Sequence, residues 1–263
     1  MTLGMESGKT SVQRSAFSVQ RKKNSSLSPP VSGEKSHNPK SEIRNPKLFR
    51  LGLFGGAFNP VHLGHLRAGL EIQEAFSLNK VIFIPTALPP HKETRNLVSF
   101  AHRLQMVRLA VAGVPSFKAS DVERKMKGKS YSIRTIRHFM KTSVSGTELF
   151  FILGLDAFLE IHTWKEFRRL FTLCHFVVMD RPGYNRKSIK DYILREISSE
   201  VIYYPREKRF LHPGGPSIFL FPITLLDISS TRIRRLRQNN QSLRFLLPEK
   251  VGNYILENRL YAP

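Results

Sequence analysis

The sequence predicts an α/β fold in which helices cover a doubly wound parallel sheet. Strand-like and helix-like patterns alternate along most of the 263 residues, and such alternation implies right-handed crossovers between parallel strands. Hydrophobic residues make up 41% of the chain, enough to bury the core of one large domain or two small ones. We expect a single domain over residues 47–263, preceded by a disordered basic extension over residues 1–46.

The first 46 residues are rich in Ser, Lys, Asn, Pro and Gly and contain few large apolar residues. Such a composition cannot bury enough apolar surface to fold on its own. A basic tail, an organelle transit peptide, a dispensable extension and a reading frame begun too far upstream all remain open as interpretations of this segment.

The first half of the predicted domain contains three strands and three helices. The apolar run LFRLGLF, from Leu48, is a buried strand, and the next segment, LGHLRAGLEIQEAF, carries an amphipathic helical pattern. KVIFIPT is a second strand, followed by the proline-rich loop ALPPHKETRN. Ser99 is a good N-cap for the helix SFAHRLQMVRLAVAG. The last two elements are a short strand within FKASDVER and a helix in YSIRTIRHFMKT.

The second half continues the alternation. Its predicted strands are ELFFILG, HFVVMD and SIFLFP, and its predicted helices are FRRLFTL, SSTRIRRLRQ and PEKVGNYILEN. The sequence leaves open whether residues 185–216 form a lid or a simple insertion.

The chain is strongly basic, with 42 Lys and Arg against 20 Asp and Glu and a formal net charge of +22. This surplus suits nucleic acid, an anionic membrane or phosphorylated small molecules. The basic residues are spread along the chain rather than gathered in one stripe, which weakens the nucleic-acid interpretation. Cys174 is the only cysteine, so an internal disulfide and a cysteine-rich zinc site are excluded. With no apolar run of about 18 residues and no apolar stretch typical of a secretory signal, we expect a cytoplasmic protein.

Residues 51–70 read LGLFGGAFNPVHLGHLRAGL, a strand that enters a Gly-Gly turn and then a helix. Ligands of open parallel sheets bind beyond the carboxyl ends of the strands. Gly55 and Gly56 let the backbone approach a ligand, and the helix start presents N–H groups to an anion. His62 and His65 would point the same way and donate hydrogen bonds to phosphate oxygens. Taken alone, the pair equally suits a surface cap beside a packed histidine, or half of a metal site.

A second phosphate-binding pattern is ISSTRIRR, Ile228 to Arg235. Ser229, Ser230 and Thr231 begin a helix, so hydroxyls and backbone N–H groups gather there, with Arg232 in its first turn. Such a helix start suits a polyphosphate. In isolation it equally suits a well-capped basic surface helix.

Other nucleotide-binding signatures are missing. The sequence has no G-x-G-x-x-G fingerprint, and the GKS triplet at residues 128–130 is not a P-loop because Glu123 occupies the required glycine position. Kinase and ATPase interpretations therefore lose their main support.

Together, GGAFNPVHLGHL and ISSTRIR resemble the nucleotidyltransferase superfamily that carries an H-x-G-H signature. The segments IPTALPPHK, FILGLDAF with Trp164 downstream, DRPGY and LLPEKVGNYILENRLY narrow the resemblance to bacterial nicotinate-nucleotide adenylyltransferases. It extends from about Leu51 to Tyr261. It implies a Rossmann-like sheet in a single nucleotidyltransferase domain that joins nicotinate mononucleotide to AMP from ATP, with Mg²⁺ held mainly by phosphates and water rather than by a protein cage.

The resemblance also implies residue roles. His62 and His65 would contact the ATP phosphates and stabilise charge at the α-phosphorus. The other implied ATP contacts are Gly55, Gly56, Phe58, Gly154, Asp156, Ile228, Ser229, Thr231 and Arg232. Those implied for the nicotinate nucleotide are Thr86, Lys92, Ser130, Tyr131 and Trp164, the last stacking on the pyridine ring. Alone, Trp164 would read as a core aromatic, His91 as a loop histidine and Asp156 as a helix N-cap.

The sequence departs from the family pattern in the N-terminal extension and at two residues. Asn59 stands where many relatives carry Asp, and Leu155 where a small or polar residue is commoner. Within the superfamily, a preference for nicotinamide mononucleotide or for phosphopantetheine stays open. The rival of another class is a basic nucleic-acid-binding protein that uses the tail and the RIRRLR helix, which leaves the paired histidines unexplained. Whether the chain forms a homo-oligomer is also open.

Overall fold

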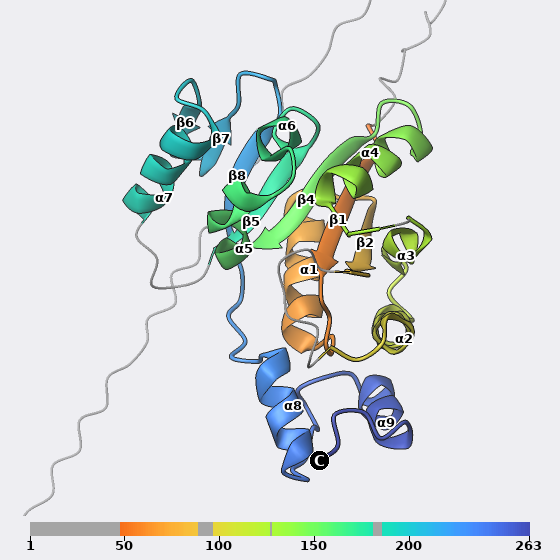
Figure 1. Ribbon diagram of the computed structural model, residues 1–263. Helices are drawn as coiled ribbons and strands as arrows, with labels where there is room; N and C mark the ends of the chain where they lie inside the picture. Colours follow the sequence, from red (N-terminus) through yellow and green to blue (C-terminus); the bar gives the residue numbers. More distant parts are fainter. Residues whose placement is uncertain (1–47, 89–96, 127, 181–185) are drawn as a thin grey trace, which may run out of the picture. The chain divides into compact units, whose positions relative to one another are not determined.

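The computed structural model describes residues 48–88, 97–126, 128–180 and 186–263 (Figure 1). The predicted extension, its boundary near residue 46, His91 and Lys92 lie outside the described residues, and the expectations for them stay predictions.

The described residues form an eight-stranded sheet with the order β3-β2-β1-β4-β5-β8-β7-β6. The strands from β3 to β8 in that order are parallel, and β7 and β6 are added antiparallel at one edge. The chain runs outward from β1 through β2 to β3 and then returns to β4 on the other side of β1. This reversal confirms the predicted doubly wound α/β fold. The strands are β1 (Arg50–Gly56), β2 (Lys80–Pro85), β3 (Phe117–Ala119), β4 (Glu148–Gly154), β5 (His175–Asp180), β6 (Ile202–Tyr204), β7 (Arg209–Leu211) and β8 (Ser217–Pro222).

The helices connect the strands and cover both faces of the sheet (Figure 1). They are α1 (Leu63–Ala75), α2 (Phe100–Val111), α3 (Val122–Lys125), α4 (Ser132–Thr142), α5 (Leu155–Leu159), α6 (Phe167–Leu170), α7 (Arg186–Tyr192), α8 (Ser230–Gln238) and α9 (Glu249–Glu257), with a 3-10 turn at Ile161–Thr163 and a π-helical turn at Ile193–Ile197. No helix in the described ranges is both long and apolar enough to span a bilayer.

The core lies in two layers because side chains alternate along each strand. In β4, Leu149, Phe151 and Leu153 pack with residues of α4 to α7 on one face. Phe150 and Ile152 pack with residues of α1, α2, α8 and α9 on the other. Continuous apolar runs such as ELFFILG therefore form strands buried on both faces, as expected for a parallel sheet.

The region after β5, whose role the sequence left open, extends the sheet. Its described part contains α7, the π-helical turn and the hairpin of β6 and β7, and β7 pairs with β8.

Candidate active site

The predicted site residues at the ends of β1, β2 and β4 meet at one edge of the sheet. Gly56 pairs in register with Pro85, and the Thr86 N–H donates to the Gly56 carbonyl at 2.9 Å. Gly154 ends β4, next to β1, and Asp156 lies exposed in the first turn of α5. This edge contains the switch between β1 and β4, where ligands of doubly wound sheets bind.

The side chain of Leu155 points into the core and not toward the predicted nucleotide site. Its side chain is 1% exposed and belongs to the hydrophobic cluster under α4 to α7. The apolar residue in the middle of GLD is therefore a core contact, and its neighbours Gly154 and Asp156 keep the outward positions.

The two histidines lie side by side at the start of α1. Their ring centroids are 3.7 Å apart at an interplanar angle of 35°. The backbone N–H of His62, the N-cap residue, donates to Nδ1 of His65 at 3.3 Å. Because Nδ1 accepts this bond, a neutral His65 carries its proton on Nε2. The helix start thus fixes the tautomer that offers a donor at the far side of the ring.

Phe58, one of the predicted ATP contacts, is buried and packs against His65. It is 2% exposed, and its ring centroid lies 5.1 Å from that of His65 in an edge-on arrangement. A Cβ on Gly56 would come within 3.1 Å of the Phe58 ring. Gly56, the last residue of β1, therefore leaves room for the Phe58 ring. Phe58 in turn packs against the His65 ring.

Gly64 leaves room for the His62 ring. A Cβ at Gly64 would lie 3.1 Å from His62 Nδ1 and 3.2 Å from its Cε1. We expect Gly64→Ala to lower turnover about 10-fold or more by displacing the ring. Stability should change by no more than about 1 kcal/mol, because the gain from alanine as the better helix former opposes the cost of crowding the buried His62 ring.

Steady-state kinetics and urea unfolding of this variant test the role of Gly64. Gly252→Ala in α9 is the matched control, because its added Cβ would meet only Leu247, at 3.3 Å. Equal turnover in the two variants would contradict the spacing role.

The loop between β1 and α1 is held from beneath by the fully buried Arg103 of α2. Its Nη1 donates to the Ala57 carbonyl at 2.9 Å and its Nε to the Val98 carbonyl at 3.0 Å. Burial lowers the pKa of this guanidinium below its ordinary value, but an arginine remains charged in proteins.

Asn59 has a structural role through its side-chain oxygen. Its Oδ1 accepts from the Val98 N–H at 3.3 Å and from the Tyr261 hydroxyl at 2.8 Å. Burial raises the pKa of the Tyr261 phenol, so this hydroxyl stays protonated as a donor. This bond attaches Tyr261, near the C-terminus, to residues 57–62 between β1 and α1, the histidine loop.

The second predicted phosphate-binding motif meets the first in the structure, although some 170 residues separate them. Ser230 Oγ donates to the Pro60 carbonyl at 2.8 Å, and Arg234 Nη1 donates to the Asn59 carbonyl at 2.9 Å. The Ile228 carbonyl would lie 3.9 Å from a Cβ on Gly64. The start of α8 is therefore adjacent to the start of α1 (Figure 1).

Two arginines in the first half of α8, Arg232 and Arg234, have different partners. Arg232 is exposed and turns back to Asp227, whose carbonyl it contacts at 3.4 Å. Arg234 instead bonds the histidine loop and, through Nη2, the Thr231 hydroxyl at 3.2 Å. Ser229 caps the helix by accepting from the Arg232 N–H. Sequence reasoning missed Arg234, although its i+3 spacing from Thr231 could have indicated it.

The residues predicted for the second substrate also come together. The Leu88 N–H donates to Ser130 Oγ at 3.0 Å, and the Ser130 N–H donates to the Leu88 carbonyl at 3.1 Å. These two bonds join the loop after Thr86 to the loop before Tyr131. The described parts of these two loops thus form one wall of the predicted site.

A buried carboxylate, Glu123, lies beneath this wall and was missed as a site residue. It accepts from the Ala87 N–H at 3.2 Å and from the Thr135 hydroxyl at 3.1 Å, and the Ser130 hydroxyl also bonds it. Burial raises the pKa of Glu123 above its ordinary value, because desolvation outweighs these bonds.

We expect the free energy of unfolding of Glu123→Gln to increase relative to that of the natural chain as pH rises above the ordinary carboxyl pKa. With a raised folded-state pKa, the folded chain binds more protons than the unfolded chain, so stability falls with pH across that window. Glutamine keeps an acceptor and never ionises. Urea unfolding at several pH values measures the difference, and a difference independent of pH would contradict the assignment.

Trp164 and Tyr131 pack against the same hydrophobic cluster and both remain partly exposed. The Trp164 ring lies edge-on to Phe151 of β4, at a centroid distance of 6.2 Å. Lys165, the next residue, places its Nζ 5.0 Å from the centre of the Tyr131 ring. The predicted pyridine-stacking residue thus lies near the start of α4.

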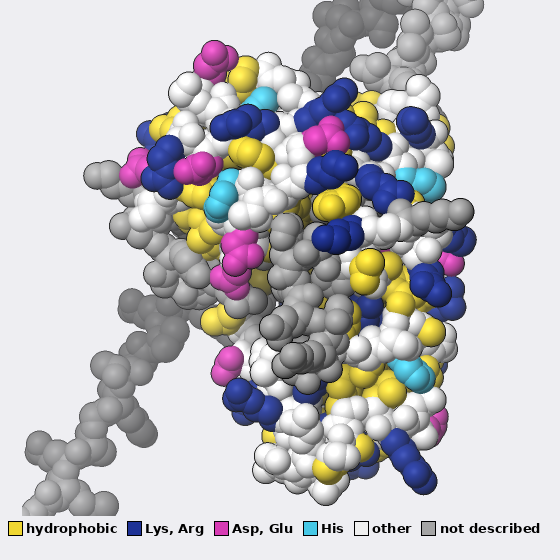
Figure 2. All heavy atoms as spheres, viewed as in Figure 1, with side chains coloured by type: hydrophobic (Ala, Val, Ile, Leu, Met, Phe, Trp, Pro, Cys, Tyr) yellow, Lys and Arg dark blue, Asp and Glu magenta, His cyan; other side chains and the backbone are white. Residues whose placement is uncertain are grey.

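Charge on the described surface follows the expected distribution. Figure 2 shows Lys and Arg side chains scattered over the visible face rather than collected in one stripe. Within the ranges that the structure describes, no three His, Cys, Asp or Glu residues are grouped so that they could hold a metal ion.

Comparison with known proteins agrees with this geometry. Residues 53–236 match the family model described as cytidylyltransferase-like. A probable nicotinate-nucleotide adenylyltransferase of Citrifermentans bemidjiense is 45% identical over 213 residues, which cover 81% of this chain and 98% of that protein. The protein of the same name from Geobacter metallireducens is 43% identical over the same shares of both chains.

A solved structure shares the fold. The Plasmodium falciparum nicotinic acid mononucleotide adenylyltransferase complexed with NaAD superposes with a TM-score of 0.62 at 16% identity, covering 81% of this chain and 97% of that one. The two phosphate-binding motifs, the doubly wound sheet and these relatives lead to one conclusion: the chain belongs to the cytidylyltransferase-like nucleotidyltransferases and, within them, to the nicotinate-nucleotide adenylyltransferase family.

Proposed function

We propose that the chain transfers the adenylyl group of ATP to nicotinate mononucleotide, forming nicotinate adenine dinucleotide and pyrophosphate in NAD biosynthesis. The observation that carries the proposal is the contact of Ser230 and Arg234, at the start of α8, with the Pro60 and Asn59 carbonyls in the loop that leads into the His62–His65 helix start. This contact supports a site in which imidazole, hydroxyl, guanidinium and helix N-terminal donors share one triphosphate.

The reaction follows from the charges of its partners. The phosphate of nicotinate mononucleotide is already an anion at pH 7, so it attacks the α-phosphorus without a general base, and pyrophosphate leaves in line. The chain then has to position the two anions and stabilise charge that develops on the α-phosphate. His65 is suited to this because its Nδ1 is occupied by the His62 N–H, which directs the Nε2 proton outward.

We propose that Mg²⁺ enters with ATP. A magnesium ion prefers phosphate oxygens and water at such sites, and bound there it neutralises charge on the leaving pyrophosphate. The chain's own groups at the helix starts would hold the remaining phosphate oxygens, with the predicted Ser229, Thr231 and Arg232, and in addition Arg234, as candidates at α8. The net charge of +22 is then matched to anionic substrates.

The second-substrate wall explains how nicotinate could be distinguished from nicotinamide. Thr86, Ser130 and Tyr131 bring hydroxyl and backbone donors to it, and a site that pairs a carboxylate rejects an amide well. The N–H groups of Thr86 and Ser130 are bonded within the chain here, to the Gly56 and Leu88 carbonyls. A carboxylate would therefore be held by them only after those bonds are exchanged. We place the reaction in the cytoplasm, in keeping with the free thiol of the buried Cys174.

A pyrophosphate-release assay with ATP and three acceptors tests the proposal. Nicotinate mononucleotide should give a kcat/KM at least about 10-fold above nicotinamide mononucleotide, and phosphopantetheine should give no release. A tenfold preference for the amide would contradict the choice of substrate. Salt-sensitive binding to generic RNA near physiological salt, without turnover of any acceptor, would favour the nucleic-acid alternative.

A further inference from the structure

The chain makes a tight turn directly after Trp164. The Phe167 N–H donates to the Trp164 carbonyl at 3.2 Å, which closes a four-residue turn with Lys165 and Glu166 at its centre. Glu166 has φ +54°, in the left-handed region. A residue other than glycine there costs about 1 kcal/mol or more, so surrounding contacts must maintain this backbone.

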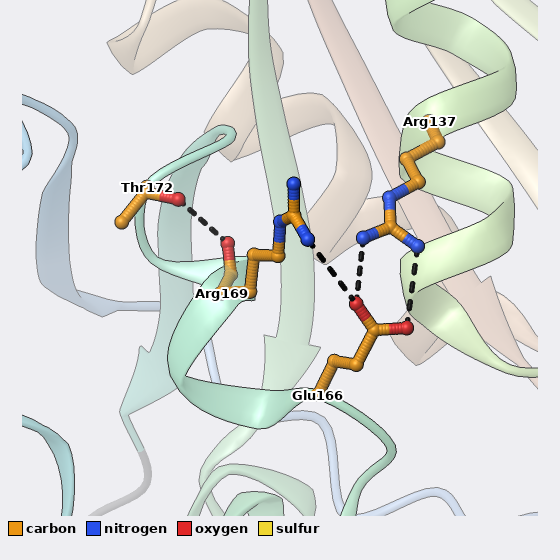
Figure 3. Close-up of polar contacts among 4 residues, drawn as sticks. All are labelled: Arg137, Glu166, Arg169 and Thr172. Carbon is orange, nitrogen blue, oxygen red and sulfur yellow. Dashed lines mark hydrogen bonds and ion pairs between the residues drawn. The ribbon is translucent and has the colours of Figure 1, made fainter.

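Two contacts attach this turn to α4. Arg137 holds the Glu166 carboxylate with both guanidinium nitrogens, Nη2 to Oε2 at 2.6 Å and Nη1 to Oε1 at 3.2 Å (Figure 3). Lys165 lies over the ring of Tyr131, the N-cap residue of the same helix. A planar fork of this kind fixes orientation as well as distance.

A third cation also faces Glu166 but does not connect the two elements. Arg169 belongs to α6, the short helix that begins directly after Glu166, and its Nη1 lies 3.9 Å from Oε2 (Figure 3). The hydrogen bonds from Arg137, and to a smaller extent the charges of Arg169 and Lys165, lower the pKa of Glu166 below its ordinary value. Loss of Arg137 would therefore leave the carboxylate with a cationic partner while removing its connection to α4.

We propose that Arg137 is a positioning residue for the pyridine-nucleotide half of the site. By holding Glu166 it keeps Trp164 and Tyr131 in a fixed arrangement, so the pyridine ring is received without first ordering the turn. Pre-ordering of this kind raises affinity because binding no longer carries the entropy of fixing the loop. The inference rests on the proposed function.

The alternative is a surface ion pair with no effect on the substrate. Exposed pairs contribute little to folding, and the side chains of Arg137 and Glu166 are 35% and 34% exposed. A surface pair of that kind would change stability slightly and leave the affinities for the two substrates in their original ratio. The two interpretations therefore predict different ratios between the affinity for nicotinate mononucleotide and the affinity for ATP when Arg137 is replaced.

Arg137→Met tests the inference by direct binding. Trp164 is the only tryptophan of the chain, so intrinsic fluorescence reports on this residue alone, and a pyridine nucleotide stacked on it should quench the emission. We expect the Kd of nicotinate mononucleotide, from fluorescence titration, and its KM to rise about 10-fold. The KM of ATP should stay within about twofold, with little change in Tm.

Arg169→Met is the matched control, since it removes a cation from the same carboxylate and leaves the Arg137 connection intact. It should bind nicotinate mononucleotide as the natural chain does. The exchange of both charges, Arg137→Glu with Glu166→Arg, should recover most of the lost affinity. Equal Kd values in the Arg137 and Arg169 variants, or a matching rise in the KM of ATP, would overturn the positioning role.

The same measurements on the natural chain distinguish a failure of the positioning role from a failure of the proposed function. If it neither binds nicotinate mononucleotide nor releases pyrophosphate, both the proposed function and the inference fail. If it does both and Arg137→Met retains its Kd, the positioning role alone fails.

Discussion

Replacement of His65 by alanine is expected to lower turnover by at least about 10²-fold while the fold remains intact. The loss of one donor aimed at transition-state charge has this magnitude. The same substitution removes the acceptor of the His62 N–H at the start of α1, which should lower stability by only about 1 kcal/mol. The rate at saturating concentrations of both substrates is the measurement, together with thermal unfolding.

Two further variants separate the donor of His65 from its helix-start contact. His65→Asn places an acceptor near the position of Nδ1 and lacks the distal donor, so it should be stable and nearly inactive. His65→Gln places an amide donor near the position of Nε2 and should retain more activity than His65→Asn. Near-normal turnover of His65→Asn would contradict the donor role.

The second large effect is expected from Arg103→Leu. This change leaves the carbonyls of Ala57 and Val98 without their guanidinium donor inside the core. Each unsatisfied buried acceptor costs about 1–3 kcal/mol, so we expect the free energy of unfolding to fall by about 2–4 kcal/mol. Turnover should fall as well, since the loop that carries Asn59 and His62 loses its support.

Urea unfolding with Arg108→Met as the reference tests this expectation. Arg108 lies on the same helix with an exposed side chain, and its replacement should change the unfolding free energy by less than about 0.5 kcal/mol. If both variants lose the same stability, the buried guanidinium has no special role in holding the loop.

The sequence predicted the central part of the fold closely. The predicted bounds of β4, β5 and β8 agree with the structure, because continuous apolar runs between polar residues are typical of strands buried on both faces. The hairpin of β6 and β7 was missed because its three-residue strands are partly exposed and lie in the segment 185–216, where the alternation of strands and helices is interrupted. So short a segment carries too little periodicity to be recognised.

The candidate site was predictable where it depends on local geometry. The histidine pair at the start of α1 and the Ser229 cap of α8 each depend on residues within one helical turn. The predicted Gly-Gly turn was wrong in one respect, because Gly55 and Gly56 are the last two residues of β1 and pair with β2. Arg103 and Glu123 were not predictable, because an arginine or glutamate in a helical pattern is normally an exposed residue. Their burial depends on carbonyl, N–H and hydroxyl partners that reach them mainly from other loops.

Transfer of labelled phosphorus tests the central claim most directly. The purified chain would be incubated with nicotinate mononucleotide and with ATP labelled at either the α- or the γ-phosphorus. The α-label should appear in nicotinate adenine dinucleotide and the γ-label in pyrophosphate, in equal amounts, because attack occurs at the α-phosphorus. Formation of ADP, with the γ-label on the mononucleotide, would place the attack elsewhere and contradict the account.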